Sequence, residues 1–375
     1  MIGAGPAGLA AANASALAGA RTVVLERAQH PRYKTCGGGL IGISLAAVRG
    51  MPIPIKDEIF AATFTRNNSH EFTRRNDSPI LKMVMRDEFD DALRCRAVAS
   101  GAALIQRAQV RAVSQDQMCA RATLADGTSI TAQVVVGADG SSGITARHVG
   151  VDFCQVDLGL EVEISVPTSI EQMWSGRVLL DWGPIPGSYA WIFPKGDRLT
   201  VGVIAARGSG EKTKEYLQDV LYRYNLATFE RLQDSGHLTK CRAEGSPLRK
   251  GRVLVAGDAA GLLEPWTREG ISFALRSGAM AGAAAAKAAR QHGTSDLDRI
   301  LDQYVSAVNG ELVPEMQAGY RLFAAFKRHP GSFHRVLATP KGWHTFVQFC
   351  QGEESFASAL QHKSAALGVY LLSRL

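Results

Sequence analysis

The stretch GAGPAG at residues 3–8 decides the fold of this 375-residue chain. Its glycines match the GxGxxG loop, which permits a tight turn and lets the backbone approach a pyrophosphate resting on the following helix N-terminus. Residues 9–17 are rich in alanine and predict that helix, and the apolar residues 22–25 predict a strand after it. Glu26 ends this strand where a carboxylate can accept hydrogen bonds from both ribose hydroxyls. Loop, helix, strand and acid together predict a dinucleotide-binding domain.

Two further apolar strands end in glycine turns. Residues 134–136 lead into the turn at residues 137–140, and residues 253–256 lead into Gly257 and Asp258. Strands of this kind with helical connections predict an α/β fold with a doubly wound, Rossmann-like parallel sheet.

The start of the chain departs from the expected pattern. A dinucleotide-binding sheet has a buried strand before its first glycine, but only Met1 and Ile2 precede Gly3. We therefore expect that Met1 is an internal or misassigned start, and that a longer reading frame supplies an apolar strand. Without such a strand, we expect weaker binding of the cofactor.

The region between the second and third strands has a different character. Residues 151–203 alternate polar and apolar side chains, contain several aromatic residues and have a hairpin turn at residues 195–197. They predict an inserted antiparallel sheet. After Gly270 an alanine-rich helix is expected to Ala289, followed by a helical cap from about Leu297. The predicted domains are a discontinuous cofactor-binding domain at 1–150 and 241–290, a substrate-binding sheet at 151–240 and a C-terminal helical region at 291–375.

Composition indicates a globular protein. Apolar residues make up 46% of the chain, and no run reaches the roughly 18 apolar residues that cross a bilayer. No secretory leader is evident and the six cysteines show no paired spacing, so we expect a cytoplasmic protein with reduced thiols. The net charge of +7 is dispersed, which argues against nucleic-acid binding. The nine histidines show no ligand spacing, so no metal is expected.

Three short motifs resemble those of the glutathione-reductase-like flavoproteins, which include aromatic hydroxylases and geranylgeranyl reductases: Glu26-Arg27, Asp139-Gly140 and Gly257-Asp258. The resemblance implies a bound FAD, with the second turn along the cofactor and Asp258 at its ribityl chain. An aspartate after a buried strand needs a hydrogen-bond partner. For either Asp139 or Asp258 alone, the alternative is a cap on the next helix.

Two other segments extend this resemblance. Arg86 matches the arginine that these proteins place near the FAD phosphates and adenosine, and an arginine at a surface helix end is the alternative. Residues 265–271 resemble the proline-rich turn into a helix that points at the flavin pyrimidine edge. The family has glycine where Arg268 stands, so Arg268 either adds positive charge at that edge or points outward. Gly143 is a second departure, at a position where the family commonly has serine.

Two motifs narrow the class. CGGGL at residues 36–40 and PGSYAWIFP at residues 186–194 resemble the CxGG and PxxYxWxFP signatures of the geranylgeranyl reductase family. The resemblance covers residues 1–277, and the C-terminal helices carry no recognised signature. The residues that the motifs place at the FAD are Gly3, Gly5, Ala7, Gly8, Glu26, Arg27, Gly37, Gly38, Gly39, Arg86, Asp139, Gly140, Gly257, Asp258, Gly270 and Ile271.

The candidate catalytic residues are Cys36, Tyr189, Trp191 and Phe193. The three aromatic residues alternate along a strand and therefore share one face, which suits an isoprenoid chain packed against the flavin. An ordinary aromatic core is the alternative. Arg32 and Lys34 precede Cys36 and could acidify its thiol. The family places this cysteine near the substrate, so it is a candidate proton donor or gate, and a compact loop residue is the alternative.

We therefore expect an FAD-dependent oxidoreductase that saturates carbon–carbon double bonds of an isoprenoid chain by hydride transfer from reduced flavin. The substrate would be a geranylgeranyl-type lipid, a pigment precursor or a prenylated quinone. Only one dinucleotide loop is present, so NAD(P)H would bind transiently, and reduced ferredoxin is an equally compatible donor. The main alternative is a flavin-dependent monooxygenase or halogenase acting on an apolar or aromatic substrate, and a non-catalytic lipid or quinone carrier is another. A lipid-soluble substrate also predicts peripheral membrane contact.

Overall fold

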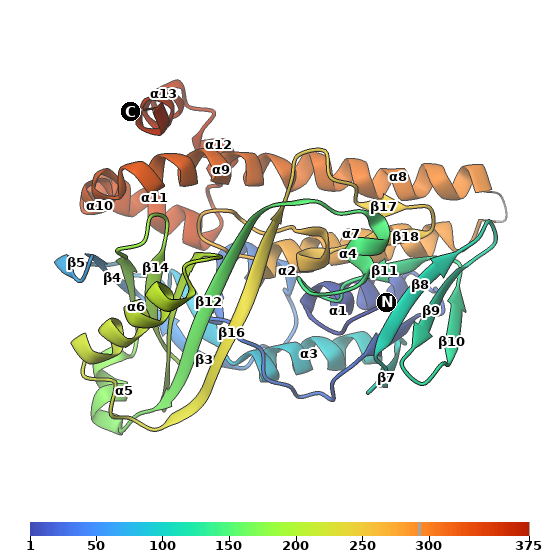
Figure 1. The fold of residues 1–375 in the computed structure, drawn as a ribbon, viewed down its shortest axis with the longest axis horizontal. Helices are drawn as coiled ribbons and strands as arrows, with labels where there is room; N and C mark the ends of the chain where they lie inside the picture. The colour runs from blue at the N-terminus through green and yellow to red at the C-terminus, as the bar shows by residue number, and fades with distance from the viewer. Residues whose placement is uncertain (292–293, 375) are drawn as a thin grey trace.

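The sheet that carries the glycine loop is parallel apart from one edge strand. The computed structural model describes residues 1–291 and 294–374 (Figure 1). The strands, in order across this sheet, are β7 (Ala103–Gln106), β1 (Val23–Glu26), Ile2 as a single bridging residue, β11 (Val135–Gly137), β18 (Val253–Val255) and β17 (Arg249–Lys250). The edge strand β17 runs antiparallel to β18, and the other pairings are parallel. The doubly wound α/β fold predicted from the three apolar strands is confirmed.

Residues 1–3 occupy the central position of this sheet. Ile2 bridges in parallel to Leu25 of β1 and to Gly137 of β11. The N–H of Gly3 donates a hydrogen bond to the Leu25 carbonyl at 2.8 Å. A very short segment therefore lies where the sequence pattern predicts a buried strand.

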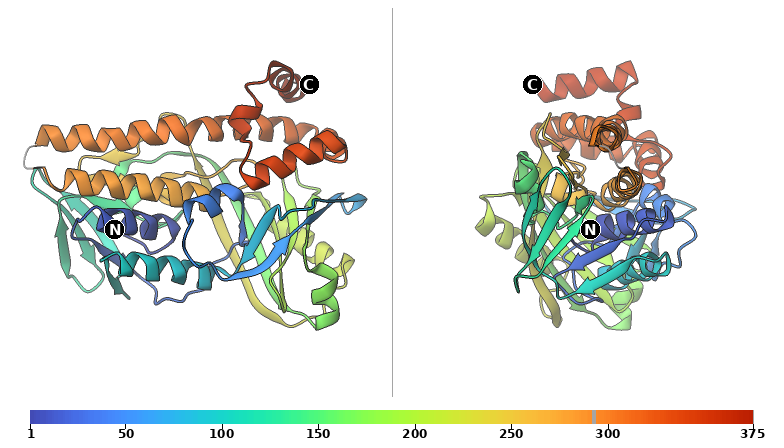
Figure 2. Two further views of the ribbon diagram at one scale, coloured as in Figure 1. Left: turned by 180° about the vertical axis from the view of Figure 1, so that it is seen from behind. Right: turned by 90° about the vertical axis from the view of Figure 1, so that its right-hand side faces the viewer.

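Long helices pack beside the parallel sheet. They are α1 (Pro6–Leu17), α3 (Arg86–Ala99), α7 (Ile271–Ala288) and α8 (Thr294–Glu311). Gly278 and Gly282 bring α7 close to α1, because a Cβ at either position would lie 2.1 Å from the carbonyl oxygen of Ala7 or Ala11. On its other side α7 runs beside α8 (Figure 2).

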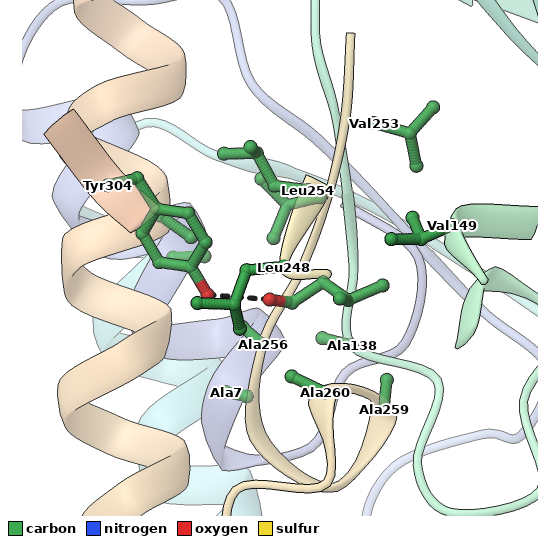
Figure 3. Packing of buried hydrophobic residues seen from close by; sticks show 14 of the residues in the cluster. Ala7, Ala138, Val149, Leu248, Val253, Leu254, Ala256, Ala259, Ala260 and Tyr304 are labelled. Atoms are coloured by element: carbon green, nitrogen blue, oxygen red, sulfur yellow. Dashed lines mark hydrogen bonds between the residues drawn. The ribbon is translucent and has the colours of Figure 1, made fainter. Parts of the chain in front are cut away.

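A buried tyrosine ties α8 to the parallel sheet. The Tyr304 hydroxyl donates a hydrogen bond to the Val255 carbonyl of β18 at 2.5 Å. Its ring packs in a cluster that includes Leu248, Leu254 and Ala256 (Figure 3). The helix that follows α7 therefore belongs to the same core as the cofactor-binding strands.

The second large sheet has seven strands. In order they are β16 (Arg231–Arg242), β12 (Phe153–Ser165), β15 (Arg198–Ala206), β14 (Tyr189–Pro194), β13 (Arg177–Trp182), β4 (Ala61–Arg66) and β5 (Ser69–Arg75). Its pairings are antiparallel except that β13 and β4 run parallel. The predicted hairpin joins β14 to β15 at residues 195–197, with Gly196 at φ +71°.

The edge of this sheet differs from the sequence expectation. β4 and β5 come from residues 61–75, inside the segment assigned to the cofactor-binding domain. Because β4 reaches β13 from a distant part of the chain, no hairpin forces the pair to be antiparallel. The helices α5 (Thr168–Trp174) and α6 (Gly210–Arg223) also lie between strands of this sheet in the sequence, and the apolar side of α6 packs on one sheet face. The domain boundaries at 150 and 240 stay a prediction.

Two small sheets and several short helices complete the region before α7. β2 (Gly39–Leu40), β6 (Leu81–Val84) and β3 (Ile55–Ile59) form one small sheet, and β8 (Val110–Gln115), β9 (Ala120–Leu124) and β10 (Ser129–Ala132) form another. The short helices are α2 (Gly42–Ala47), α4 (Thr145–Val149) and the 3₁₀ helix η1 (Gly257–Ala260).

The chain ends in helices, as the sequence predicts. After α8 come α9 (Val313–Arg328), α10 (Pro330–Leu337), α11 (Pro340–Gln351), α12 (Phe356–Ala359) and α13 (Lys363–Arg374). Phe326 and Trp343 from these helices join the core behind β4 and β13. Figure 1 shows α13 at one end of the molecule, beyond α9. Among the helices of the described residues, none has both the length and the apolar character of a membrane span.

Candidate active site

One cavity of about 1,260 Å³ runs between the two large sheets. One end is lined by the glycine loop and Glu26, and the middle by Cys36 and the aromatic residues of β14. The far end is lined by side chains of the C-terminal helices, namely Phe333, Val336, Phe346, Phe349, Phe356, Leu360, Val369 and Leu372. The sequence reasoning found no role for these helices, which form one wall of the cavity.

The glycine loop is shaped to hold a phosphate group. Gly3 has φ +97°, and a Cβ there would lie 2.3 Å from the Ala138 carbonyl oxygen. A Cβ at Gly8 would lie 1.9 Å from the carbonyl oxygen of Gly3. Gly5 precedes α1 and no side chain caps this helix, so its first N–H groups remain available beside the cavity. Gly3, Gly5 and Ala7 line the cavity, and their expected contact with FAD stays a prediction.

Glu26 is held in a fixed orientation at the same end. Its Oε2 accepts a hydrogen bond from the Ala4 N–H at 2.6 Å, and its Oε1 accepts from the Ala28 N–H at 2.8 Å. Only 5% of this residue is exposed, yet it lines the cavity beside the exposed Arg27. A rigid carboxylate at this strand end suits a ribose.

Asp139 acts as a helix cap. Its Oδ2 accepts hydrogen bonds from the N–H groups of Ile144 at 2.7 Å and Thr145 at 3.1 Å, and its Oδ1 accepts from the Thr145 hydroxyl. A Cβ at Gly143 would lie 2.1 Å from the Asp139 carboxyl carbon, so glycine at that position leaves room for the cap. The turn still lines the cavity through Asp139 and Gly140. The Asp139 carboxylate therefore caps the N-terminus of α4, which is the alternative that the sequence left open for this residue.

Asp258 lies beside a histidine that sequence reasoning missed. Its Oδ2 is 3.8 Å from His237 Nε2 on β16, and both residues line the cavity. Burial alone would raise the pKa of Asp258, but His237 and the charge of Lys34 outweigh it and lower the pKa. Burial lowers the pKa of Lys34, with Arg86 acting in the same direction. The preceding Gly257 has φ +57°, and a Cβ there would lie 2.8 Å from Ala7.

Two arginines share the buried Asp90. Arg86 makes two hydrogen bonds to Asp90, at 3.0 and 3.1 Å, and Arg32 lies 3.3 Å from the same carboxylate. Arg32 also donates to the Ala4 carbonyl at 3.4 Å, so it lies at the glycine loop. Arg86 instead interacts with Cys36. Both arginines line the cavity, and the expected roles of Arg86 at the FAD phosphates and of Arg32 beside the thiol stay predictions.

The Cys36 loop lies against the seven-stranded sheet. The Cys36 N–H donates to Glu161 Oε1 at 3.0 Å, and Lys195 Nζ donates to the Cys36 carbonyl at 3.5 Å. A Cβ at Gly37 would lie 2.8 Å from the Phe193 ring. Gly38 has φ +75°, and a Cβ there would lie 2.3 Å from a backbone oxygen. Gly37 and Gly38 thus let the loop lie close to its neighbours, and Gly39 after them also lines the cavity.

The aromatic residues of β14 form a wall of the cavity. Tyr189, Trp191 and Phe193 all line it, with successive ring centroids 5.9 and 6.2 Å apart. The Tyr189 hydroxyl donates to the Thr267 carbonyl at 2.5 Å, which ties the wall to the turn before α7. The Trp191 indole lies over Gly202, where a Cβ would be only 2.1 Å from the ring.

The turn before α7 holds its arginine, Arg268, in the interior of the protein. Arg268 has φ +57°, the left-handed conformation that glycine adopts most readily. Its side chain does not point outward, because it lines the cavity, pairs with Asp157 at 3.1 Å and lies over the Phe323 ring. Gly270 and Ile271 line the cavity, and the Glu269 carboxylate accepts from the Ser272 N–H at 2.8 Å and caps α7.

A model of the FAD binding domain family matches residues 1–309. The chain therefore belongs to the flavoproteins built on this FAD-binding domain. It is 31% identical over 286 residues to an uncharacterized protein of Methanosarcina barkeri, covering 75% of this chain and 72% of that protein. It is 28% identical over 313 residues to the digeranylgeranylglycerophospholipid reductase of Methanocaldococcus jannaschii, covering 79% of this chain and 78% of that protein. Within the class, it is an FAD-dependent oxidoreductase of the geranylgeranyl reductase type.

Solved structures show the same fold. A geranylgeranyl bacteriochlorophyll reductase-like protein from Thermoplasma acidophilum has a TM-score of 0.81 and 17% identity, covering 99% of this chain and 98% of that one. A variant of a flavin-dependent brominase has a TM-score of 0.76 and 19% identity, covering 100% and 97%. At such identities the likeness concerns the fold alone. No group of three or more potential metal ligands occurs among the residues that the structure describes.

Proposed function

We propose that the protein saturates carbon–carbon double bonds in the isoprenoid chain of a geranylgeranyl-type lipid, a pigment precursor or a prenylated quinone. The observation that carries this proposal is the continuity of the cavity. It runs from the glycine loop past Cys36 and Trp191 to the apolar side chains of α10–α13. The cavity is polar at the glycine loop and apolar at α10–α13. A nucleotide cofactor would fit the polar end, and a flexible apolar chain would fit the other.

The residues at the polar end fit an FAD. The uncapped N-terminus of α1 would take the pyrophosphate, and Glu26 would take the adenosine ribose. Bound and reduced FAD supplies a hydride, and the protein must supply a proton to the second carbon. Cys36 is half-buried on the cavity wall beside Lys34 and Arg86, which supports its expected role as proton donor or gate.

Two electron donors are compatible with this proposal. The sequence has one dinucleotide loop, which the FAD would occupy, so NAD(P)H would bind transiently. Reduced ferredoxin would need only approach the flavin edge. Rates of flavin reduction by NADPH, NADH and reduced ferredoxin distinguish these donors directly.

Anaerobic turnover tests the proposed reaction. Dithionite-reduced enzyme is mixed with a geranylgeranyl lipid in the absence of oxygen, and flavin absorbance and product mass are followed. We expect the flavin to reoxidise while the lipid gains two hydrogens for each bond reduced. An absolute need for oxygen would overturn the proposal and favour a monooxygenase or halogenase, which the brominase-like fold also accommodates. A flavin that no substrate reoxidises would instead indicate a lipid or quinone carrier.

We also propose that the apolar end of the cavity faces a membrane surface. Val336 of α10 lines this end and is 58% exposed. Leu367 of α13 is also 58% exposed and precedes Gly368, which lines the cavity. Exposed apolar side chains beside an apolar opening would let a lipid-soluble substrate enter without crossing water.

A further inference from the structure

Three carboxylates point from β12 toward the same side of the seven-stranded sheet. Asp157, Glu161 and Glu163 are separated by even numbers of residues along the strand and therefore share one face, and none is more than 3% exposed. Asp157 pairs with Arg268 at 3.1 Å, and Glu163 pairs with Lys195 at 3.6 Å. Among the described residues, no cation lies within ion-pairing distance of Glu161. This carboxylate therefore differs from its two neighbours.

Glu161 lies at the cavity with one oxygen unused. Its Oε1 accepts hydrogen bonds from the Cys36 N–H at 3.0 Å and from the Tyr33 hydroxyl at 3.1 Å. Its Oε2 is buried and has no hydrogen-bond partner in the described part of the chain. The residue lines the cavity, so this oxygen remains for a molecule bound there.

The surroundings favour the neutral acid form of Glu161. A buried carboxylate without a counter-charge is costly, whereas a protonated carboxyl group is tolerated. Burial raises the pKa of Glu161, although Lys195 and the Cys36 N–H act in the opposite direction. A proton on Oε2 would have no acceptor among the described protein groups and would face the bound substrate.

Glu161 and the aromatic wall face the same space. Glu161 on β12 and Trp191 on β14 are both in register with Gly202 on the strand between them. The Trp191 indole lies over Gly202, and its Nε1 likewise has no hydrogen-bond partner among the described residues. An apolar chain on the tryptophan would thus lie next to the acid.

We propose that Glu161, and not Cys36, is the catalytic acid that protonates the substrate carbon during double-bond reduction, which leaves Cys36 the role of gate; the inference rests on the function proposed above. As the π bond breaks, one carbon receives a hydride with its electron pair from the reduced cofactor. The other carbon forms a bond to the proton of Glu161. The substrate gains two electrons and two hydrogens, the flavin loses two electrons, and Glu161 is left as a carboxylate.

A hydrogen-bond chain returns the proton to Glu161. The Tyr33 hydroxyl, which donates to Glu161, lies 3.0 Å from Ser235 Oγ, and the Thr35 hydroxyl donates to Ser235 at 2.9 Å. Burial and the charge of Glu161 hold the pKa of Tyr33 well above its usual value, so its hydroxyl stays protonated and can pass a proton on. Ser235 is half-buried on the edge strand β16, where water can supply the chain.

Glu161→Gln tests this role without removing the structural hydrogen bond. The amide oxygen still accepts from the Cys36 N–H, but the side chain has no acidic proton. FAD content and reduction by dithionite should match the wild type, while substrate-dependent reoxidation should slow by about 100-fold or more. The wild-type rate should fall as pH rises through the pKa of Glu161, because only the protonated form donates. The Gln variant should lose this alkaline fall.

Two further variants control for position and chemistry. Glu161→Asp retains an acid, so a reduced rate that still falls at high pH is expected. Glu163→Gln removes the neighbouring carboxylate on the same face, and its alkaline fall should remain. Unchanged reoxidation in Glu161→Gln, or an unchanged alkaline fall, would overturn the inference.

Infrared spectroscopy separates this inference from the proposed function. In the FAD-loaded enzyme without substrate, a protonated-carboxyl band of Glu161 should be present in the wild type and lost in Glu161→Gln; it is read from the difference spectrum of the two proteins, in which the signal of Glu264 cancels. If the band is missing from the wild type while the lipid is still reduced, the catalytic acid is overturned alone. If the band is present but the wild-type flavin is never reoxidised by a polyprenyl lipid, the proposed reaction fails and the role of Glu161 in it fails with it.

Discussion

Arg268 and Asp157 form a buried ion pair that joins the turn before α7 to strand β12. Their Nε and Oδ2 atoms are 3.1 Å apart, and each side chain is 3% exposed. Arg268 also donates to the Gly187 carbonyl at 3.2 Å, next to the aromatic strand β14. The turn that borders the cofactor end of the cavity is thus held by the sheet that forms its substrate wall. A change at this pair should therefore affect both stability and the site.

Asp157→Ala should destabilise the protein strongly. It leaves Arg268 buried without a counter-charge, which costs about 3–5 kcal/mol of unfolding free energy. Urea unfolding followed by circular dichroism at fixed FAD concentration measures the loss. The control is Asp296→Ala, whose partner Arg299 is 64% exposed, and it should change stability by no more than about 0.5 kcal/mol. Equal effects of the two substitutions would contradict the prediction.

Gly8→Ala should abolish flavin binding. The new Cβ would lie 1.9 Å from the Gly3 carbonyl oxygen, so the loop must open and lose its fit to the pyrophosphate. The ratio of flavin to protein absorbance in purified material reports the loss. Gly310→Ala on α8 is the matched control, because no atom lies within 4 Å of its added Cβ. A Gly8→Ala protein that retains full flavin would show that the loop does not hold the cofactor.

Glu264 should make stability depend on pH. Burial raises the pKa of Glu264 to about 7, although hydrogen bonds from Thr267 and Trp266 oppose the shift. Because the folded state favours the protonated acid, Glu264 contributes fully to the free energy of unfolding below about pH 4.5. This contribution is lost as pH rises through about 7. The loss amounts to roughly 3 kcal/mol.

The Glu264→Gln variant should lack this loss. Its amide oxygen can still accept from the backbone of Trp266 and Thr267, and it carries no charge at either pH. Unfolding free energies of both proteins at pH 5 and pH 8 provide the comparison. At pH 8 the free energy of unfolding of the variant should increase relative to that of the wild type. Parallel pH profiles of the unfolding free energy would refute the raised pKa of Glu264.

Gly202→Ala should impair substrate reduction while FAD remains bound. Its Cβ would lie 2.1 Å from the Trp191 ring, so the indole must move away from the wall. Anaerobic reoxidation by a geranylgeranyl lipid should slow, with flavin content unchanged. Gly210→Ala serves as the control, since its nearest neighbour would be 3.9 Å away. Normal turnover in Gly202→Ala would argue that the tryptophan does not contact substrate.

Membrane contact should depend on the exposed apolar side chains at the cavity end. The double change Val336→Asp and Leu367→Asp places two charges where a bilayer would meet the protein. We expect reduced co-sedimentation with phospholipid vesicles and a higher KM for vesicle-bound substrate. Met173→Asp changes an equally exposed apolar residue on α5, which lies at the bottom of Figure 1 whereas α10 and α13 lie above it, and should bind vesicles normally. Equal binding by all three proteins would refute a membrane-facing opening.

Local sequence patterns determined much of this protein. The glycine loop and its helix, the strand ending at Glu26, the turn at residues 195–197 and the shared face of Tyr189 and Trp191 all follow from short-range geometry. These features depend on residues only a few positions apart, where backbone conformation and strand alternation dominate. They were sufficient to predict a dinucleotide-binding fold, whereas FAD as the cofactor was implied by the resemblance to known flavoproteins.

Only the tertiary structure decided which side chains become partners. Cys36 and Glu161 are 125 residues apart, yet they share a hydrogen bond, and Arg268 meets Asp157 across 111 residues. The alternation of Asp157, Glu161 and Glu163 was visible in the sequence, but an alternating strand does not reveal which carboxylate receives a cation. That choice depends on long-range packing between the two sheets, because ion pairing and burial are properties of the assembled core and not of any single segment.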